Sequence, residues 1–152
     1  MAVFYSFHYD KDNWRVQQVR NIGAIDNTGS VAAQEWEPVR YKTESAIKEW
    51  IDQQMSYKRA VVVLIGAETA TRKWVKYEIQ RAWNLKKPLL GIRIHGLKGR
   101  SGNTATRGAN PFEQFGYWQV PVFDPEGYDS TTKFAAIRNN LSGWIAQGYR
   151  RL

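Results

Sequence analysis

Residues 60–66, AVVVLIG, form an uninterrupted apolar run that closes on a glycine. A strand inside a parallel sheet is buried on both faces, so its sequence is continuously apolar rather than alternating. A second run, LLGIRI at residues 89–94, is mostly apolar and is interpreted as another strand. The segment between the two runs has apolar residues at helical spacing, which predicts a strand, a helix and a strand in succession. This order is typical of a parallel sheet covered by helices.

The alternation of strands and helices continues on both sides of this unit. Further strands are expected at residues 2–7 and 119–123. Helices are expected at residues 11–21 after an Asp10 cap, from Thr43 to about residue 55, from a Thr69 or Thr71 cap to about residue 86, and at residues 131–149.

Two polar segments that contain glycine, residues 23–38 and 96–108, are expected to be loops, the second of them flexible. The sequence therefore predicts a single α/β domain spanning residues 1–152. We expect a flavodoxin-like, doubly wound parallel sheet of four or five strands with helices on both faces. Ligands of such sheets bind outside the carboxyl ends of the strands, which points to residues 6–10, residues 66–74 and the chain from residue 95 onwards.

The composition argues against several classes of protein. The chain of 152 residues contains no Cys and two His, so we expect neither a disulfide framework nor a metal site. No apolar run reaches the roughly 18 residues of a membrane span, and residues 1–10 lack the pattern of a secretory signal, so we expect a cytoplasmic protein. The net charge of +8 is scattered along the chain, which favours a soluble basic surface over a nucleic-acid binder.

Glu78 departs from the pattern of its predicted helix. At about 100° per residue it falls inside the apolar arc that includes Ile79, where an unpaired carboxylate is costly to bury. Two interpretations follow. Glu78 lies at the rim of the helix and pairs with Arg81 or Arg72, or it is a pocket carboxylate with Trp74, one turn earlier, in the pocket wall.

Other motifs carry weaker signals. Ser6 and His8 alternate along the end of the first strand and share a face, but no nucleophile elbow accompanies them. The central strand ends at Gly66 with no G-K-[ST] sequence after it, which argues against a P-loop. Residues 67–69 contain no Asp, which argues against a phosphorylated receiver domain.

The chain resembles a known family at this point. The opening AVFYSFHYDKD is similar to the first strand and loop of TIR domains, and VVLIGAETATRKWVKYEIQRA is similar to the TIR segment in which a strand leads to a helix with W-x-x-x-E. Trp74 and Glu78 occupy those two positions. The stretches EWEPVRYKTESAIKEWI, GIRIHG, GANPFEQF and DSTTKFAAIRNNLSGWI, in that order, resemble the ThsB-like TIR proteins of bacterial Thoeris anti-phage defence.

The resemblance implies roles for individual residues. Glu78 inherits the position of the catalytic residue, and Trp74 that of a pocket wall. Ser6, Phe7 and His8 match the strand-end positions that contact the nicotinamide side of the substrate. The implied substrate is NAD, with no further cofactor and no metal. One carboxylate suffices, because cleavage of the nicotinamide–ribose bond passes through an oxocarbenium-like state that a carboxylate stabilises.

The resemblance also implies a function and partners. We expect an NAD-processing enzyme that cleaves the nicotinamide–ribose bond and makes an ADP-ribose-derived nucleotide signal in anti-phage defence. Self-association on activation and a separate effector protein that senses the product are expected, whereas membrane contact is not. The alternative is a non-enzymatic TIR-type adaptor that acts by self-assembly, although a scaffold has no need of a carboxylate at Glu78.

Overall fold

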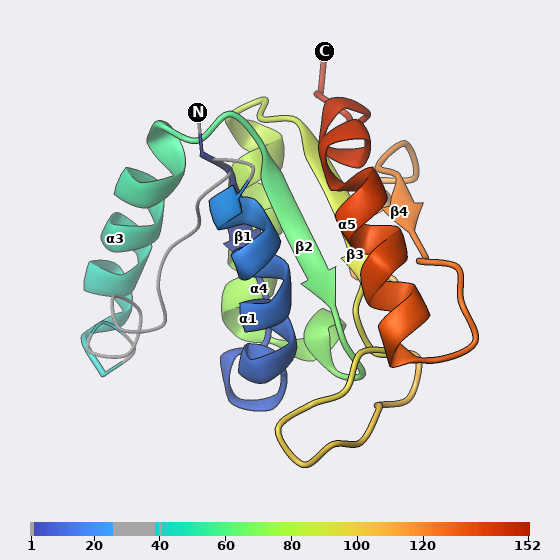
Figure 1. Cartoon of the computed structure of the whole chain (residues 1–152). Helices are drawn as coiled ribbons and strands as arrows, with labels where there is room; N and C mark the ends of the chain where they lie inside the picture. Colours follow the sequence, from blue (N-terminus) through green and yellow to red (C-terminus); the bar gives the residue numbers. More distant parts are fainter. Residues whose placement is uncertain (1, 26–38, 40) are drawn as a thin grey trace.

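The computed structural model describes residues 2–25, 39 and 41–152. Its centre is a parallel sheet with the strand order β1-β2-β3-β4 (Figure 1). The strands are β1 (Phe4–Ser6), β2 (Val61–Ile65), β3 (Leu89–Arg93) and β4 (Val122–Phe123). The register pairs Val61 with Phe4 on one side and with Leu89 on the other. The predicted parallel α/β sheet is therefore confirmed, with four strands in the described part of the chain.

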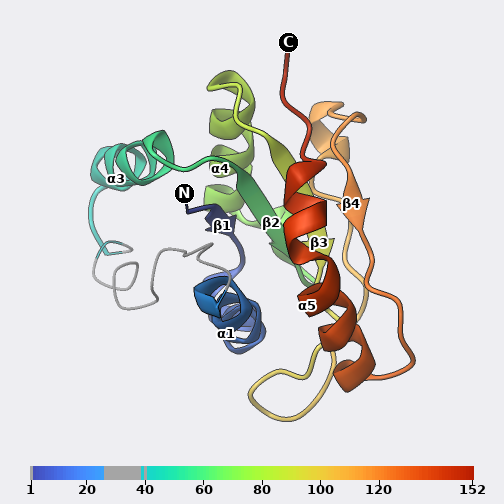
Figure 2. The same cartoon turned by 45° about the horizontal axis from the view of Figure 1, so that its top comes forward.

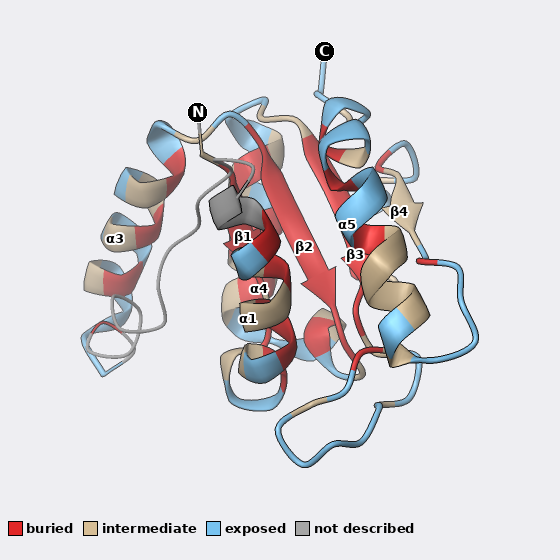
Figure 3. Ribbon diagram, in the orientation of Figure 1, coloured by how far each residue is buried: buried red, intermediate tan, exposed pale blue. Residues whose placement is uncertain are grey.

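Helices cover both faces of this sheet (Figure 2). They are α1 (Tyr9–Ile25), α3 (Glu44–Ser56), α4 (Lys73–Asn84) and α5 (Ser130–Ala146), and short 3-10 turns lie at Thr69–Thr71 and Glu113–Phe115. α1 and α5 pack on one face, where Val62 and Leu64 point, and α3 and α4 pack on the other, where Val61 and Val63 point. β2 is buried along its whole length because successive side chains enter these two cores alternately (Figure 3).

The predicted boundaries of α1 were wrong at both ends. The helix begins at Tyr9, so Asp10 lies in its first turn instead of capping it, and the backbone carbonyl of His8 accepts from the amide of Asp12. The helix also runs to Ile25, past the predicted end at residue 21. The first residues of the predicted loop at 23–38 are therefore helical, and residues 26–38 lie outside the described residues.

The predicted cap of α4 was also wrong. Thr69 lies in a 3-10 turn, and its hydroxyl accepts from the amide of Gly66 at 2.7 Å. Arg72 occupies the N-cap position and makes no side-chain capping bond. Thr69 and Thr71 belong to this turn and cannot cap the helix, so α4 begins only at Lys73 and ends at Asn84.

The other helix predictions fared better. The Thr43 cap of α3 is confirmed, since its hydroxyl accepts from the amide of Ala46 at 3.3 Å. α5 ends at Ala146, short of the predicted residue 149. Tyr149 instead exchanges two backbone hydrogen bonds with Leu89, at 2.8 and 2.9 Å, in an antiparallel bridge.

Residues 96–108 contain no helix or strand, as predicted for a loop. A buried ion pair on α1 anchors this loop: Arg15 Nη1 lies 3.0 Å from Asp12 Oδ1. Arg15 also donates to the backbone carbonyls of Leu97 at 2.8 Å and Asn103 at 2.9 Å. In the described part of the chain, no helix is long and apolar enough to cross a membrane.

Candidate active site

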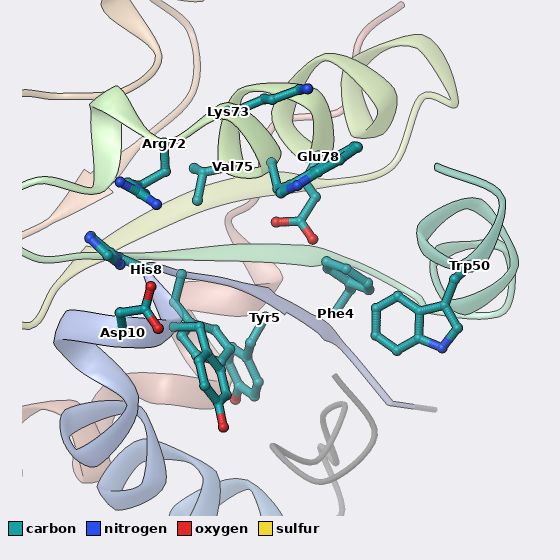
Figure 4. A pocket seen from close by; sticks show the side chains of 12 residues that line it. Phe4, Tyr5, His8, Asp10, Trp50, Arg72, Lys73, Val75 and Glu78 are labelled. Atoms are coloured by element: carbon teal, nitrogen blue, oxygen red, sulfur yellow. The ribbon is translucent and has the colours of Figure 1, made fainter. Parts of the chain in front are cut away.

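A cavity of about 320 Å³ opens between the carboxyl end of β1 and the first turns of α4 (Figure 4). Its volume is at the lower end of the range for small-molecule sites. Most of its lining residues are aromatic or charged: Phe4, Tyr5, Phe7, His8, Tyr9, Asp10, Trp50, Arg72, Lys73, Trp74, Val75 and Glu78. The cavity thus lies at the strand ends near residues 6–10 and 66–74, two of the three segments that the fold class indicated.

Glu78 is the acidic group at the centre of this cavity. α4 buries Val75, Ile79 and Ala82 against the sheet, and Glu78 lies on the same side of the helix with 7% of its surface exposed. Its Oε1 atom accepts a hydrogen bond of 2.6 Å from the hydroxyl of Ser6. This contact joins β1 to α4 and fixes the orientation of the carboxyl group.

The rim interpretation of Glu78 is therefore wrong. Arg81 pairs with Asp52 of α3, with Arg81 Nε 3.0 Å from Asp52 Oδ1, and Arg72 makes no ion pair with Glu78. The pocket interpretation, in which Glu78 shares one cavity with Trp74, matches the geometry.

The protonation of Glu78 follows from its surroundings. Burial raises the pKa of Glu78 to about 8, and the hydrogen bond from Ser6 opposes this shift. The carboxyl group is therefore mostly neutral at pH 7. A cation bound beside it would favour the ionised form and lower its pKa.

Aromatic side chains form the walls around Glu78. Trp74 lines the cavity and meets Tyr77 edge-on, with ring centroids 5.9 Å apart. Phe7 lies beside Tyr9 at 6.4 Å between ring centroids. Trp50 of α3 closes one end (Figure 4). Such walls suit a flat ring and keep water from the carboxyl group.

The residues named from the sequence fall in two places. Phe7, His8, Trp74 and Glu78 line the cavity, whereas Ser6 is not a lining residue and contacts Glu78 through its hydroxyl group. No hydrogen bond joins Ser6 to His8 among the described residues, so the pair has no geometry for nucleophilic catalysis.

The sequence did not indicate Trp50 as a lining residue, and it named Arg72, within the indicated segment 66–74, only as a possible partner of Glu78. Trp50 follows the apolar stripe of its helix, so its spacing indicated a core position. Arg72 comes directly before the W-x-x-x-E helix, and its place at the N-cap was the one local signal that could have found it.

Comparison with known proteins identifies the family of this fold and cavity. The family model described as "Thoeris protein ThsB, TIR-like domain" matches residues 4–99, which include β1, β2, α4 and every candidate site residue. The chain belongs to the ThsB TIR-like family. The resemblance seen in the sequence is therefore confirmed.

A relative from Bacillus cereus (strain MSX-D12) agrees with this assignment. It bears the name "Putative cyclic ADP-D-ribose synthase ThsB1" and is 36% identical over 120 residues, or 76% of this chain. The matched region spans 62% of that relative's length.

Proposed function

We propose that this ThsB TIR-like chain is an NAD-processing enzyme that breaks the nicotinamide–ribose bond at Glu78 and makes an ADP-ribose-derived nucleotide signal for anti-phage defence. The observation that carries the proposal is a buried carboxyl group in an aromatic cavity, held by Ser6 and with no cation paired to it. The name of the Bacillus cereus relative, which refers to cyclic ADP-ribose synthesis, supports the same chemistry.

The substrate supplies the cationic partner that Glu78 lacks. The nicotinamide ring of NAD is a cation, and the aromatic walls around Trp74 and Phe7 suit its flat surface. Its arrival next to Glu78 favours loss of the carboxyl proton, because an opposite charge within a few ångströms stabilises the ionised form. Ser6 then donates to the carboxylate and holds one oxygen, leaving the other for the substrate.

Bond breaking transfers charge within the substrate. The electron pair of the bond between ribose C1′ and the ring nitrogen moves onto nitrogen, and neutral nicotinamide leaves. Positive charge appears on C1′ and the ring oxygen, as in glycoside hydrolysis. The carboxylate of Glu78 stabilises this charge, and it does so more strongly in a dry cavity than in water.

The second step decides the product. If water adds at C1′, it loses a proton and gives ADP-ribose. If a nucleophilic atom of the same ADP-ribose unit adds at C1′, the product is cyclic. We infer that the chain favours cyclisation, because the aromatic walls and the 7% exposure of Glu78 limit access of water.

The test is product analysis of the purified chain with NAD. Mass spectrometry should find free nicotinamide together with a cyclic isomer of ADP-ribose, and Glu78→Gln should abolish both while its melting temperature stays at or above that of the wild type. Glu126→Gln, which changes an exposed carboxylate outside the cavity, is the matched control. A folded Glu78→Gln variant that still releases nicotinamide would remove Glu78 from catalysis.

The proposal extends to assembly and signalling. We expect self-association on activation, so nicotinamide release per mole of chain should rise with protein concentration or a crowding agent. A protein-free filtrate from phage-challenged cells should activate a separate effector, and that activity should vanish with Glu78→Gln. If the wild type releases no nicotinamide at any concentration yet defends cells, the adaptor alternative is the better account.

A further inference from the structure

The cavity has a second polar end, formed by Arg72 and His8. Figure 4 shows these two side chains close together at one end, Trp50 at the other end and the carboxyl group of Glu78 between them. Arg72 holds the N-cap position of α4, and His8 lies in the turn between β1 and α1. The two ends therefore offer different chemistry to one bound molecule.

Both side chains at this end lack partners in the described part of the chain. His8 has 5% of its surface exposed, and its imidazole makes no hydrogen bond with a described residue. The guanidinium of Arg72 likewise makes no hydrogen bond or ion pair there. Arg72 is exposed to solvent, whereas His8 is almost completely buried, where a polar side chain without a partner is costly. Both side chains line the cavity and keep their donors available to a ligand that enters it.

The neighbouring lysine side chains form ion pairs with carboxylates. Lys73 pairs with Glu44 at 2.6 Å, and Lys11 pairs with Glu68 at 3.0 Å. The remaining acidic group at this end, Asp10, lies in the first turn of α1, where the helix dipole compensates a carboxylate. Arg72 therefore keeps its charge available to a ligand.

The start of α4 adds to the positive potential. Because Arg72 makes no side-chain capping bond, the first amide groups of the helix have no side-chain acceptor. Such a helix end favours anions, and phosphate groups above all. A guanidinium and an imidazole thus lie close together beside the first turn of α4.

We propose that this end of the cavity binds a phosphate group of the nucleotide substrate, with Arg72 and His8 donating to its oxygens. This assignment replaces the contact with the nicotinamide side that the family resemblance implied for His8, because His8 lies beside Arg72. The inference rests on the proposed function, because the phosphate then belongs to the molecule whose glycosidic bond lies at Glu78. Holding a phosphate away from the reacting bond orients the ribose and makes the enzyme prefer a dinucleotide over an unphosphorylated nicotinamide riboside.

Calorimetry with inorganic pyrophosphate tests the site without any turnover. Pyrophosphate should bind the full wild-type chain, and Arg72→Ala should raise its Kd by about tenfold or more, as expected for loss of a charge-assisted hydrogen bond. His8→Phe should weaken binding as well. Lys76→Ala removes the same charge from the same helix outside the cavity and should change Kd by less than about twofold.

Kinetics provide the second arm. Arg72→Ala should raise KM for NAD with a small change in kcat, and should lower kcat/KM for nicotinamide riboside far less than for NAD. Equal losses in Arg72→Ala and Lys76→Ala, unchanged binding in Arg72→Ala, or no pyrophosphate binding to the wild type would each overturn the inference. If pyrophosphate binds through Arg72 but NAD is not cleaved, the phosphate site stands and the proposed function fails.

Discussion

Asp12 and Glu78 are the buried carboxyl groups of the described chain, and their surroundings are opposite. Asp12 on α1 pairs with Arg15, whose guanidinium lies 3.0 Å away and also holds the loop at residues 96–108. Glu78 on α4 has the hydroxyl of Ser6 and no cation. Burial raises the pKa of both groups; Arg15 offsets only part of the shift at Asp12, whose pKa stays above its ordinary value.

These two residues show how a buried carboxyl group can serve either the fold or the chemistry of a site. A carboxylate whose charge is matched by a fixed cation contributes to the fold and has little left for a ligand. A buried carboxyl group without a cationic partner stays protonated, because burial disfavours its ionised form. A cationic ligand that binds next to it favours ionisation. The difference lies in the partner, since both side chains are almost completely buried.

The largest expected effect comes from neutralising each acid in turn. Glu78→Gln should lower the rate of nicotinamide release by at least about a thousandfold, because the transition state loses its counter-charge. Asp12→Asn should keep the rate within several-fold of the wild type while unfolding at lower denaturant concentration. Steady-state kinetics and urea melts of both variants check this, and a reversed pattern would exchange the two roles.

Removing the guanidinium of the Asp12–Arg15 pair should have the next largest effect, which is a loss of stability. Arg15→Ala leaves Asp12 buried and unpaired and frees the carbonyls of Leu97 and Asn103. The free energy of unfolding should fall by about 3–5 kcal/mol. Arg107→Ala, which breaks an exposed pair with Asp124, should cost at most about 1 kcal/mol. Equal losses in the two variants would mean that burial of the Arg15 pair is irrelevant.

Glu78, which has no cationic partner, should also make the free energy of unfolding depend on pH. Glu78 ionises near 4.5 in the unfolded chain and near 8 in the folded one. Between these values the folded state binds more protons, so its stability is highest at low pH and falls as pH rises, by at most about 1.4 kcal/mol per unit. Glu78→Gln removes this slope.

The measurement compares urea melts of the two proteins across the pH range. From pH 5 to pH 7.5, the stability of Glu78→Gln relative to the wild type should grow by about 2–3 kcal/mol. Asp12 is present in both proteins, so its own titration cancels. A pH-independent difference would show that Glu78 is already ionised in the folded state.

Ser6→Ala tests the smallest effect. Loss of the hydroxyl should lower kcat about tenfold with little change in KM, since Ser6 orients Glu78 from outside the cavity. It should also raise the pKa of Glu78 further and move the acid limb of the pH–rate profile upward. Ser6→Thr, which keeps a donor, should restore the profile. A raised KM with an unmoved profile would instead favour the substrate contact inferred from the sequence.

The features that the sequence predicted correctly are those that depend on local patterns of apolar residues. The continuous apolar run at residues 60–66 predicted a parallel strand buried on both faces, and residues 89–94 predicted another strand. β2 and β3 confirm both predictions. The place of Glu78 in an apolar arc followed from helical spacing alone. These features depend on neighbours within one or two turns, which a single sequence displays.

Long-range partners were beyond such reasoning. The hydrogen bond between Ser6 and Glu78 joins residues 72 positions apart, and the bond from Arg15 to Leu97 spans 82. Helical spacing indicated Arg81 as a partner of Glu78, but Arg81 instead pairs with Asp52 of α3. The threonine caps failed because a 3-10 turn precedes α4, and a turn residue resembles a cap in sequence.

The neutral state of Glu78 turns ligand binding into a proton-release reaction. A nicotinamide cation that enters the cavity at pH 7 exchanges one positive charge for another, because the carboxyl proton leaves to the buffer as the ring arrives. The observed binding enthalpy should then vary linearly with the ionisation enthalpy of the buffer, and the affinity should rise with pH up to about 8. Before that exchange the neutral carboxyl group of Glu78 itself adds no long-range attraction for inorganic cations. If the proposed function holds, binding of the nicotinamide cation at Glu78 is therefore coupled to the release of one proton.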